Sequence, residues 1–455
     1  MKFSFLSSVY LTAAVATSVS GTILDNGHPR DTNFIDTLVD VSGYELQTYG
    51  ANATEISYKG RWDSKHMSWW TAPGLRFGFT GDTVAITFGN HTVDSTLVAY
   101  RIGGMDWQFS NVTARGTHLF VTSETEGVNE TTPFSPIPFE MRVTNWGYGV
   151  QIDKVHVAQK KELVKLDEYR RTVEFIGDSL SSGMYNSYEG ISGFAYGVGA
   201  GLGETEFSIT AYPGICVADQ DCWGNPRGQS HQWFYASDTS GRAREIWGDD
   251  PEPWDFSAHP AADLVIINIG TNDQNEANNV SRRDYVEHYK KLIQGVHGKW
   301  PDAQVVMMSL WLGFYQSGNS FFKVFEMDDE IKAVHEYFNS RSYLDNPVVW
   351  DGTTNATTTL NPSNSAANAS AKSHAHSRAG GNGRKRAKPF VHIFNTTGIL
   401  QHGDIGPQWH PTDVGQIKVA FSLMQYVRMT FGWELELSGP ELFHETLYWN
   451  DQSDY

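Results

Sequence analysis

The pattern of apolar residues changes near residue 160, and this change restricts the folds that the chain can adopt. On the N-terminal side, short alternating runs are separated by Gly, Asn and Pro; they are Leu75–Phe79, Thr83–Phe88, Thr96–Tyr100, His118–Val121, Glu140–Val143 and Val150–Val157. Short strands with turns at this spacing are typical of a sandwich or a barrel. We therefore predict an all-β domain over residues 31–160.

A different pattern begins after the charged segment Gln159–Arg171. Near-continuous apolar runs, expected as strands, alternate with helix-like stretches. The strand-like runs are Thr172–Ile176, Leu264–Ile269, Gln304–Ser309 and Pro347–Trp350, and the clearest helices are Arg282–Lys299, Asp328–Phe338 and Asp413–Met429. Runs without strict alternation indicate a parallel sheet that is covered on both faces. The pattern predicts an α/β domain over residues 170–435 and a tail over residues 436–455.

Residues 352–389 interrupt this second domain. They are rich in Ser, Thr, Asn, Ala and Gly, and such a segment buries too little apolar surface to order itself. We predict a disordered surface insertion. It ends in a basic cluster at residues 383–388, for which a processing site and a nuclear signal are the alternatives; secretion would argue against the second.

The first 21 residues have the features of a secretory signal peptide: a positive start, an apolar stretch through Leu11–Val15, and small residues at Ser18, Ser20 and Gly21. A buried N-terminal strand or helix is the alternative. No later stretch is long and apolar enough to span a membrane. We expect a secreted, extracellular glycoprotein, whose N-x-[ST] acceptors are Asn52, Asn90, Asn111, Asn129, Asn279, Asn355, Asn368 and Asn395.

The composition narrows the choice of partner. The formal charge of −18 and the pI near 5.3 argue against a nucleic-acid binder. The aromatic share of 13% favours a carbohydrate partner, because exposed Trp and Tyr are common stacking surfaces, although most such residues belong to cores. Cys216 and Cys222 are the only two cysteines. In an oxidising compartment a short-loop disulfide is the default for such a pair, and no further residues have the spacing of zinc ligands.

A candidate nucleophile follows the apolar run Thr172–Ile176, in the tetrapeptide Gly177-Asp178-Ser179-Leu180. A strand that stops there can present the serine hydroxyl at the carboxyl edge of the sheet, where ligands bind in open α/β folds. Taken alone, the tetrapeptide is better explained as a turn or a helix cap. Its significance comes from two further segments that follow in order along the chain.

The first of these supplies candidate oxyanion donors. Asn272, in Gly270-Thr271-Asn272-Asp273, follows the run Leu264–Ile269 and could donate its amide at the same edge; an Asx turn is the alternative. Gly214 follows another strand-like run and could offer its backbone N–H, or it could form an ordinary turn. A disulfide between Cys216 and Cys222 could stiffen the Gly214 loop or simply staple a surface loop.

The second segment supplies a candidate base. His410 lies in a loop just before the helix that starts near Asp413, so its imidazole can reach a serine at the sheet edge. A solvent-exposed loop histidine is the alternative, and His402 is the nearest competitor for the role. Three tryptophans lie near the inferred site by sequence and could stack on sugar rings, although such residues more often belong to the core: Trp223, Trp311 and Trp409.

These blocks resemble those of the SGNH (GDSL-type) hydrolases. Gly177-Asp178-Ser179-Leu180, Gly214, Gly270-Thr271-Asn272-Asp273 and His410 occur in the order of that family. The chain is most similar to carbohydrate esterase family 2, through Lys59-Gly60-Arg61-Trp62, Phe79-Thr80-Gly81 and Trp409-His410-Pro411. The resemblance implies an N-terminal all-β jelly-roll sandwich joined to a C-terminal three-layer α/β SGNH domain with a parallel sheet.

The resemblance also implies roles for individual residues. Ser179 would be the nucleophile and His410 the base, with an oxyanion hole from the N–H groups of Ser179 and Gly214 and the side chain of Asn272. The usual acid two or three residues before the histidine is missing, because those positions are Gln408 and Pro407. A backbone carbonyl, as in part of family 2, or Asp404 could orient His410, and the carbonyl is the preferred candidate. A slow or inactive enzyme is the third alternative.

The sequence therefore predicts a secreted serine esterase that removes O-acetyl groups from a plant polysaccharide such as xylan or mannan. The chain has no Gly-x-Ser-x-Gly, His-Glu-x-x-His or phosphate-loop motif, and we expect no cofactor and no metal. We expect a monomer with an acetylated oligo- or polysaccharide as partner, and neither a nucleic acid nor a membrane. A general short-chain or lipase-like SGNH esterase and a catalytically silent carbohydrate-binding protein are the alternatives.

Overall fold

The computed structural model describes residues 34–128, 135–311, 314–323, 327–352, 357–359 and 388–436, and the backbone of two short strands, β1 (Leu24–Asp25) and β2 (His28–Pro29). The expected signal peptide, nearly all of the expected insertion with its basic cluster, and the tail beyond residue 436 lie outside these residues. None of the helices in the described ranges is long and apolar enough to cross a membrane.

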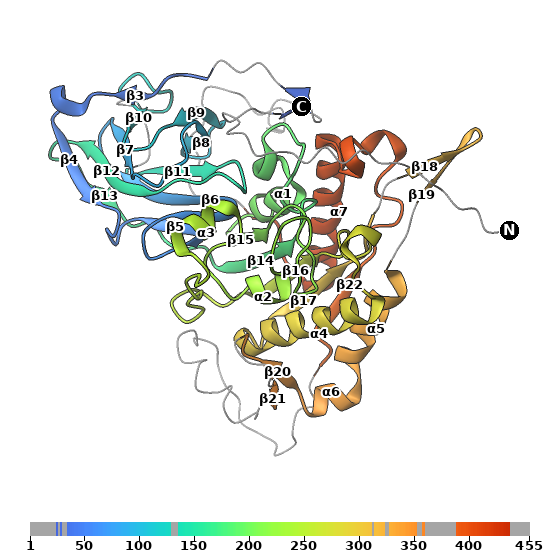
Figure 1. Ribbon diagram of the computed structural model, residues 1–455. Coiled ribbons are helices and arrows are strands. Elements are labelled where there is room, and N and C mark those ends of the chain that lie inside the picture. Colours follow the sequence, from blue (N-terminus) through green and yellow to red (C-terminus); the bar gives the residue numbers. More distant parts are fainter. Residues whose placement is uncertain are drawn as a thin grey trace, which may run out of the picture.

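The N-terminal domain is the expected β-sandwich (Figure 1). One antiparallel sheet contains, in spatial order, β3 (Leu38–Val39), β10 (Thr117–Val121), β7 (Val84–Phe88), β12 (Ile152–Ala158) and β4 (Leu46–Gly50). The second contains β6 (Ser68–Phe79), β11 (Ile137–Val143), β8 (Thr96–Ile102) and β9 (Gln108–Val112), with β5 (Ser57–Trp62) and β13 (Leu163–Val164) also paired to β6. Alternate side chains from the two sheets, including Phe77, Phe88 and Phe139, form one buried core.

The C-terminal domain is built on five parallel strands in the order β22 (Val391–Phe394), β17 (Gln304–Met308), β16 (Leu264–Asn268), β14 (Arg171–Gly177) and β15 (Thr205–Ala211). Neighbouring residues of each strand point to opposite cores. Ile176 and Val265 pack beneath α4 (Arg282–Lys299) and α5 (Asp328–Asn339). Phe175 and Ile266 pack beneath α1 (Phe194–Gly201) and α7 (Asp413–Phe431). This confirms the expected three-layer architecture.

The helices begin where the sequence offers caps. Ser281 accepts a hydrogen bond from the N–H of Asp284 at the start of α4, and Thr412 accepts one from Gly415 at the start of α7. The left-handed Gly432 ends α7. Shorter elements complete this domain: α2 (Gln229–Gln232), α3 (Gly241–Trp247), α6 (Arg341–Asp345), β18 (Phe314–Ser317), β19 (Ser320–Lys323), and the 3₁₀ turns η2 (Glu189–Ser192), η3 (Glu276–Asn278), η4 (His402–Asp404) and η5 (Pro407–Trp409). One further 3₁₀ turn, η1 (Val41–Gly43), belongs to the sandwich.

One expected strand lies outside the parallel sheet. The run Pro347–Trp350 forms β20 (Val348–Trp350), which pairs antiparallel with β21 (Thr357–Thr359). It packs against α4, since an added Cβ at Gly298 of that helix would lie 3.2 Å from the carbonyl oxygen of Trp350. The sheet position beside β17 is taken by β22, where His392 interrupts the apolar pattern that would have indicated a strand.

The two domains share a sheet. β6 of the sandwich pairs with β15 at Thr71 and Ile209, and the Thr71 hydroxyl donates to the carbonyl of Ala211 at 2.8 Å. Beside this junction, the buried guanidinium of Arg61 on β5 lies 3.1 Å from the carboxylate of Glu174 on β14. The N-terminal domain therefore contacts β14 and β15, the strands that lead to the candidate site, in addition to its covalent connection to the C-terminal domain.

Candidate active site

The candidate site lies where the order of the parallel strands reverses. The first strand of the domain, β14, has the second strand, β15, on one side and the third, β16, on the other. Ligands in open α/β sheets bind outside the carboxyl ends of the strands at this kind of switch point. Ser179 follows β14, Gly214 follows β15 and Asn272 follows β16, so the topology brings the three expected residues to one edge of the sheet.

A compact turn holds Ser179. The N–H groups of Ser181 and Ser182 donate to the carbonyl of Asp178 at 3.2 and 3.0 Å, and the N–H of Met184 donates to that of Ser179 at 3.1 Å. A side chain at Gly177 would collide with Ser181, because its Cβ would lie 2.1 Å from that hydroxyl. The backbone N–H of Ser179 has no hydrogen-bond acceptor within the described ranges, which leaves it available to a ligand.

His410 is held with one ring nitrogen available. Its Nδ1 lies 2.9 Å from the carbonyl oxygen of Gln408. Because a carbonyl only accepts, Nδ1 carries the proton, and Nε2 keeps the lone pair that a general base needs. Nε2 is buried and has no hydrogen-bond partner among the described residues. Burial lowers the pKa of His410 below its usual value, so the imidazole is neutral at pH 7.

Hydrogen bonds tie the serine segment to the histidine segment. The Asn186 amide donates to the carbonyl of Pro411 at 3.0 Å. The Gln416 amide, on the first turns of α7, donates to the Asn186 side-chain oxygen at 2.9 Å. Pro411 directly follows His410, so these bonds fix the position of the imidazole relative to the turn of Ser179.

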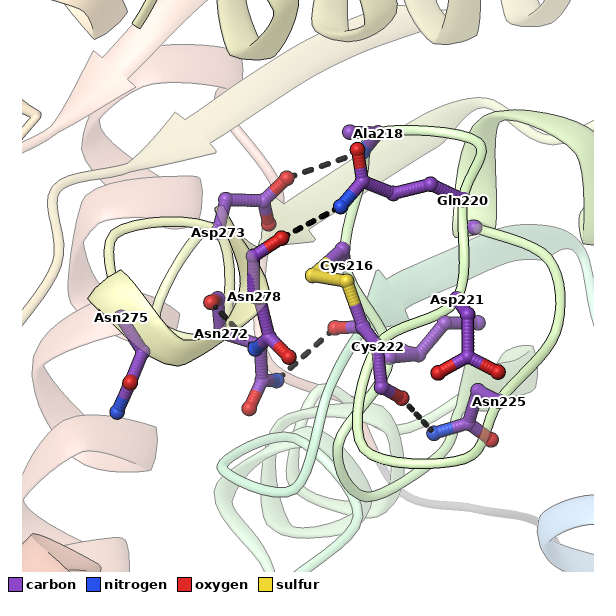
Figure 2. The surroundings of a disulfide bond; sticks show 12 residues. Cys216, Ala218, Gln220, Asp221, Cys222, Asn225, Asn272, Asp273, Asn275 and Asn278 are labelled. Carbon is purple, nitrogen blue, oxygen red and sulfur yellow. Dashed lines mark hydrogen bonds between the residues drawn. A yellow bond between two sulfur atoms is a disulfide. The ribbon is translucent and has the colours of Figure 1, made fainter. Parts of the chain in front are cut away.

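The expected oxyanion residues also meet. Asn272 donates its amide to the carbonyl of Ile215 at 2.9 Å (Figure 2). Gly214, one residue earlier, has a positive φ of 78°, and an added Cβ would lie 3.1 Å from Asn225 Nδ2. Glycine therefore permits both the left-handed backbone and the tight packing against that neighbour. Its N–H has no acceptor in the described part of the chain.

The disulfide supports this loop. Cys216 and Cys222 are bonded and fully buried, as expected for the pair (Figure 2). Between them, the N–H groups of Val217 and Ala218 donate to the carboxylate of Asp273 at 2.9 and 3.0 Å. The disulfide loop is thus attached to the residue that follows Asn272, and it braces the segment after Gly214 instead of stapling a separate surface loop.

The two candidates for orienting His410 are placed differently. The carbonyl of Gln408 contacts the imidazole, as described above. The carboxylate of Asp404 accepts two hydrogen bonds from Lys418 at 2.8 Å and one from the N–H of Gln401 at 2.8 Å. The competing histidine, His402, lies against Phe321, with ring centroids 3.8 Å apart.

Asp404→Ala should therefore leave catalysis nearly unchanged. If the Gln408 carbonyl fixes the imidazole tautomer, kcat for a small acetyl ester should fall by no more than about threefold, whereas loss of a true orienting carboxylate costs roughly 10⁴-fold. Steady-state kinetics of the purified variant provide the measurement, and Lys418→Ala is the matched control. A loss of several orders of magnitude in Asp404→Ala alone would assign the orienting role to the carboxylate.

The three tryptophans have different surroundings. Trp223 is 42% exposed and follows Gly214 along the chain. Trp409 is 62% exposed and directly precedes His410. Trp311 is 1% exposed and packs against Phe194, so it belongs to the core and offers no stacking surface. The sequence reasoning missed Tyr185, whose ring lies perpendicular to that of His410 with centroids 5.0 Å apart. The one sequence signal for Tyr185 as a site residue was its position six residues after Ser179.

The expected glycosylation acceptors within the described residues are all exposed. They are Asn52, Asn90, Asn111, Asn279 and Asn395, while Asn129, Asn355 and Asn368 lie outside the described residues.

Within the described ranges, no group of three or more His, Cys, Asp and Glu side chains could hold a metal ion. Modification and the expected lack of a cofactor both stay predictions.

Comparison with known proteins agrees with this geometry. Residues 175–376 match the model of the GDSL-like Lipase/Acylhydrolase family, a range that includes Ser179, Gly214 and Asn272 and ends before His410. This part of the chain is therefore similar to GDSL-type (SGNH) hydrolase domains. No curated protein matches the chain.

The whole two-domain fold is shared with solved carbohydrate esterases of family two. The Clostridium thermocellum enzyme in complex with cellohexaose has a TM-score of 0.57 at 17% identity and covers 83% of this chain and 99% of its own. The Cellvibrio japonicus enzyme has a TM-score of 0.59 at 13% identity, over 86% and 99%. An acetyl xylan esterase from the rumen bacterium Butyrivibrio proteoclasticus has a TM-score of 0.56 at 16% identity, over 86% and 99%. At these identities the likeness is one of fold; with the family match, it supports a carboxylic ester hydrolase.

Proposed function

We propose that this chain is a secreted serine esterase that removes O-acetyl groups from carbohydrate. The observation that carries the proposal is the state of His410. Its Nδ1–H donates to the Gln408 carbonyl, and its buried Nε2 has no partner among the described residues. The histidine segment is bonded to the loop that follows Ser179, at the switch point of the sheet. A neutral imidazole in this arrangement can accept a serine proton.

The proposed reaction proceeds through an acyl-enzyme. Nε2 of His410 takes the proton of the Ser179 hydroxyl as Oγ attacks the ester carbonyl, and the imidazolium returns that proton to the departing sugar oxygen. Water then enters and loses a proton to His410 as its oxygen attacks the acyl carbonyl. The bond between the acyl carbon and Ser179 Oγ breaks, the imidazolium returns the proton to Oγ, and acetic acid leaves. The Gln408 carbonyl holds the imidazolium through Nδ1–H in both half-reactions.

The negative oxygen that forms in each half-reaction needs donors. The N–H groups of Ser179 and Gly214 and the second amide hydrogen of Asn272 are the proposed oxyanion hole. Asn272 already uses one hydrogen to bind the carbonyl of Ile215, and this bond fixes the direction of the other. Donors positioned before the reaction lower the barrier because they need no reorganisation.

The carbohydrate substrate is proposed from the exposed aromatic surface and from the neighbours. Trp223 and Trp409 flank the site and offer stacking faces for sugar rings. One neighbour of the same fold was solved with cellohexaose, and another is described as an acetyl xylan esterase. Secretion and glycosylation are proposed from the N-terminal sequence and from the exposed Asn-x-Ser/Thr acceptors.

Acetate release from a substrate panel tests this function. The panel contains acetylated xylan, acetylated mannan, simple acetylated hexoses and a long-chain ester. We expect the acetylated carbohydrates to be preferred over the long-chain ester, since the site is flanked by exposed tryptophans. A preference for the long chain would indicate a lipase-like esterase. Glycan binding without turnover, and without labelling of Ser179 by an organophosphate, would indicate a silent binding protein.

A further inference from the structure

The loop that follows Ser179 is held from the N-terminal domain. We call residues 181–193 the serine loop. The amide of Asn145, which lies after β11 of the sandwich, donates to the carboxylate of Glu189 in this loop at 2.5 Å. The N–H of Gly190 donates to the carbonyl of Thr144 at 2.8 Å. The ring of Tyr188 stacks on that of Phe109 of β9, with centroids 4.2 Å apart and an interplanar angle of 13°.

Glu189 is held in a conformation that needs this support. Its φ is +47°, in the left-handed region that a residue of its size seldom adopts. Such strain persists only where the surroundings determine the backbone. Asn145 is itself fixed, because its side-chain oxygen accepts from the N–H groups of Gly147 and Tyr148 at 2.5 and 2.8 Å. A rigid part of the sandwich therefore determines the conformation of Glu189.

Glu189 in turn contacts the turn of the nucleophile. A Cβ at Gly183 would lie 2.2 Å from the carbonyl oxygen of Glu189, so the two backbones are in close contact. Gly183 lies between Ser182 and Met184, whose N–H groups help to close the turn of Ser179. A displacement of Glu189 would thus be transmitted to the position of the serine hydroxyl.

The same loop reaches the histidine. The N–H and the hydroxyl of Ser187 both donate to the carboxylate of Asp413, the first residue of α7. Asp413 lies three residues after His410. The serine loop is therefore bonded to the sandwich at Glu189 and Gly190, and to the histidine segment at Asn186 and Ser187.

We propose that Asn145 of the N-terminal domain is a positioning residue for the Ser179–His410 pair, acting through Glu189. This inference rests on the proposed function for the identity of the pair. It goes beyond that function because it gives the sandwich a role in positioning the Ser179–His410 pair. This role does not depend on glycan binding by the sandwich.

The test exchanges the two partners of the Asn145–Glu189 hydrogen bond. Asn145→Asp replaces the donating amide with a carboxyl group beside Glu189, whose pKa burial already raises to about 7. The second carboxyl raises the pKa of the pair further, so the two groups share a proton at neutral pH and repel each other only where both are ionised. The kinetics are therefore measured at the highest pH that the unmodified enzyme tolerates. The N–H groups of Gly147 and Tyr148 keep their acceptor. We expect kcat for a small acetyl ester to fall on the order of tenfold to a hundredfold through misplacement of reacting groups, with KM changed less than about twofold.

The double variant Asn145→Asp/Glu189→Gln restores one donor and one acceptor. We expect its kcat to recover to within about threefold of the unmodified enzyme, as a coupled pair should in a double-mutant cycle. Glu189→Gln alone should stay near the unmodified rate. Gln47→Glu, an exposed site on β4, is the control for added charge on the sandwich. An unchanged kcat in Asn145→Asp, or a double variant no faster than Asn145→Asp, would overturn the inference.

Amide hydrogen exchange gives a readout that does not depend on turnover. Asn145→Asp should accelerate exchange in residues 181–193 and in residues 410–416, and the double variant should reverse both effects. Unchanged exchange in the second segment would refute the coupling. If the unmodified chain releases acetate from no ester, the proposed function fails, and exchange in residues 410–416 still decides the coupling between the sandwich and the histidine segment.

Discussion

Ser179→Ala should lower kcat for an acetyl ester by about 10⁵-fold or more, because without a nucleophile no acyl-enzyme can form. The residue lies in a turn closed by backbone hydrogen bonds, so loss of its hydroxyl should leave the fold intact. Circular dichroism and thermal melting verify the fold, and mass spectrometry should show organophosphate labelling only where Ser179 is present. Activity within a hundredfold of the unmodified enzyme would remove the proposed mechanism.

A matched control exists within the same domain. The hydroxyl of Ser230 lies 3.1 Å from Nδ1 of His288, so a serine and a histidine outside the proposed catalytic pair are in contact. That Nδ1 also accepts the N–H of Asp219, and Ser230 is fully buried, so the contact is structural. Ser230→Ala should retain the unmodified kcat.

Double substitution distinguishes a catalytic pair from two independent contributions. Residues that act as a unit are strongly non-additive. Ser179→Ala/His410→Ala should therefore be no slower than Ser179→Ala within about threefold. A product of the two separate losses would mean that His410 acts without Ser179 and would require another mechanism.

Arg61→Met should produce the largest loss of stability among single substitutions at the domain junction. Its guanidinium is buried, lies 3.1 Å from the Glu174 carboxylate and donates to the carbonyls of Trp233 and Tyr235 at 2.5 and 2.7 Å. Removing one partner of a buried pair leaves the other charge uncompensated, which costs about 3–5 kcal/mol. Urea unfolding, followed by tryptophan fluorescence, measures the change.

Two further variants show whether this cost comes from the unpaired carboxylate. Arg61→Met/Glu174→Gln removes the remaining charge and should recover part of the loss. Arg282→Met breaks an ion pair with Glu330 in which the arginine side chain is 60% exposed, and it should cost less than about 1 kcal/mol. Similar losses at the two arginines would contradict a special role for the buried junction.

The sequence predicted those features that local patterns determine. The runs over Thr172–Ile176 and Leu264–Ile269 became β14 and β16 because buried parallel strands need continuous apolar residues. Ser179 and Asn272 then reached one edge because parallel strands end on the same side. The order of the strands, which places Ser179 at a switch point, depends on long-range packing and could not be predicted from the runs.

The features that escaped prediction involve residues distant in sequence. Val391–Phe394 was missed as a strand because its pairing with β17 outweighs a histidine in its centre. The sequence left Trp311 as a candidate for stacking, yet it packs against Phe194 of α1, more than 100 residues away. A backbone carbonyl was the preferred partner of His410, but a carbonyl has no sequence signature, so only the structure could assign it to Gln408.

The pairing of β6 with β15 also affects how the protein is made. β15 is the outer strand of the parallel sheet, and exposed outer strands recruit other chains and start aggregates. Thr71 occupies part of that edge, through its pairing with Ile209 and its hydrogen bond to Ala211. Because the sandwich leaves the ribosome first, this cover exists before the vulnerable strand is synthesised. We therefore expect the order of the domains along the chain to limit self-association of the nascent hydrolase domain at this part of the edge.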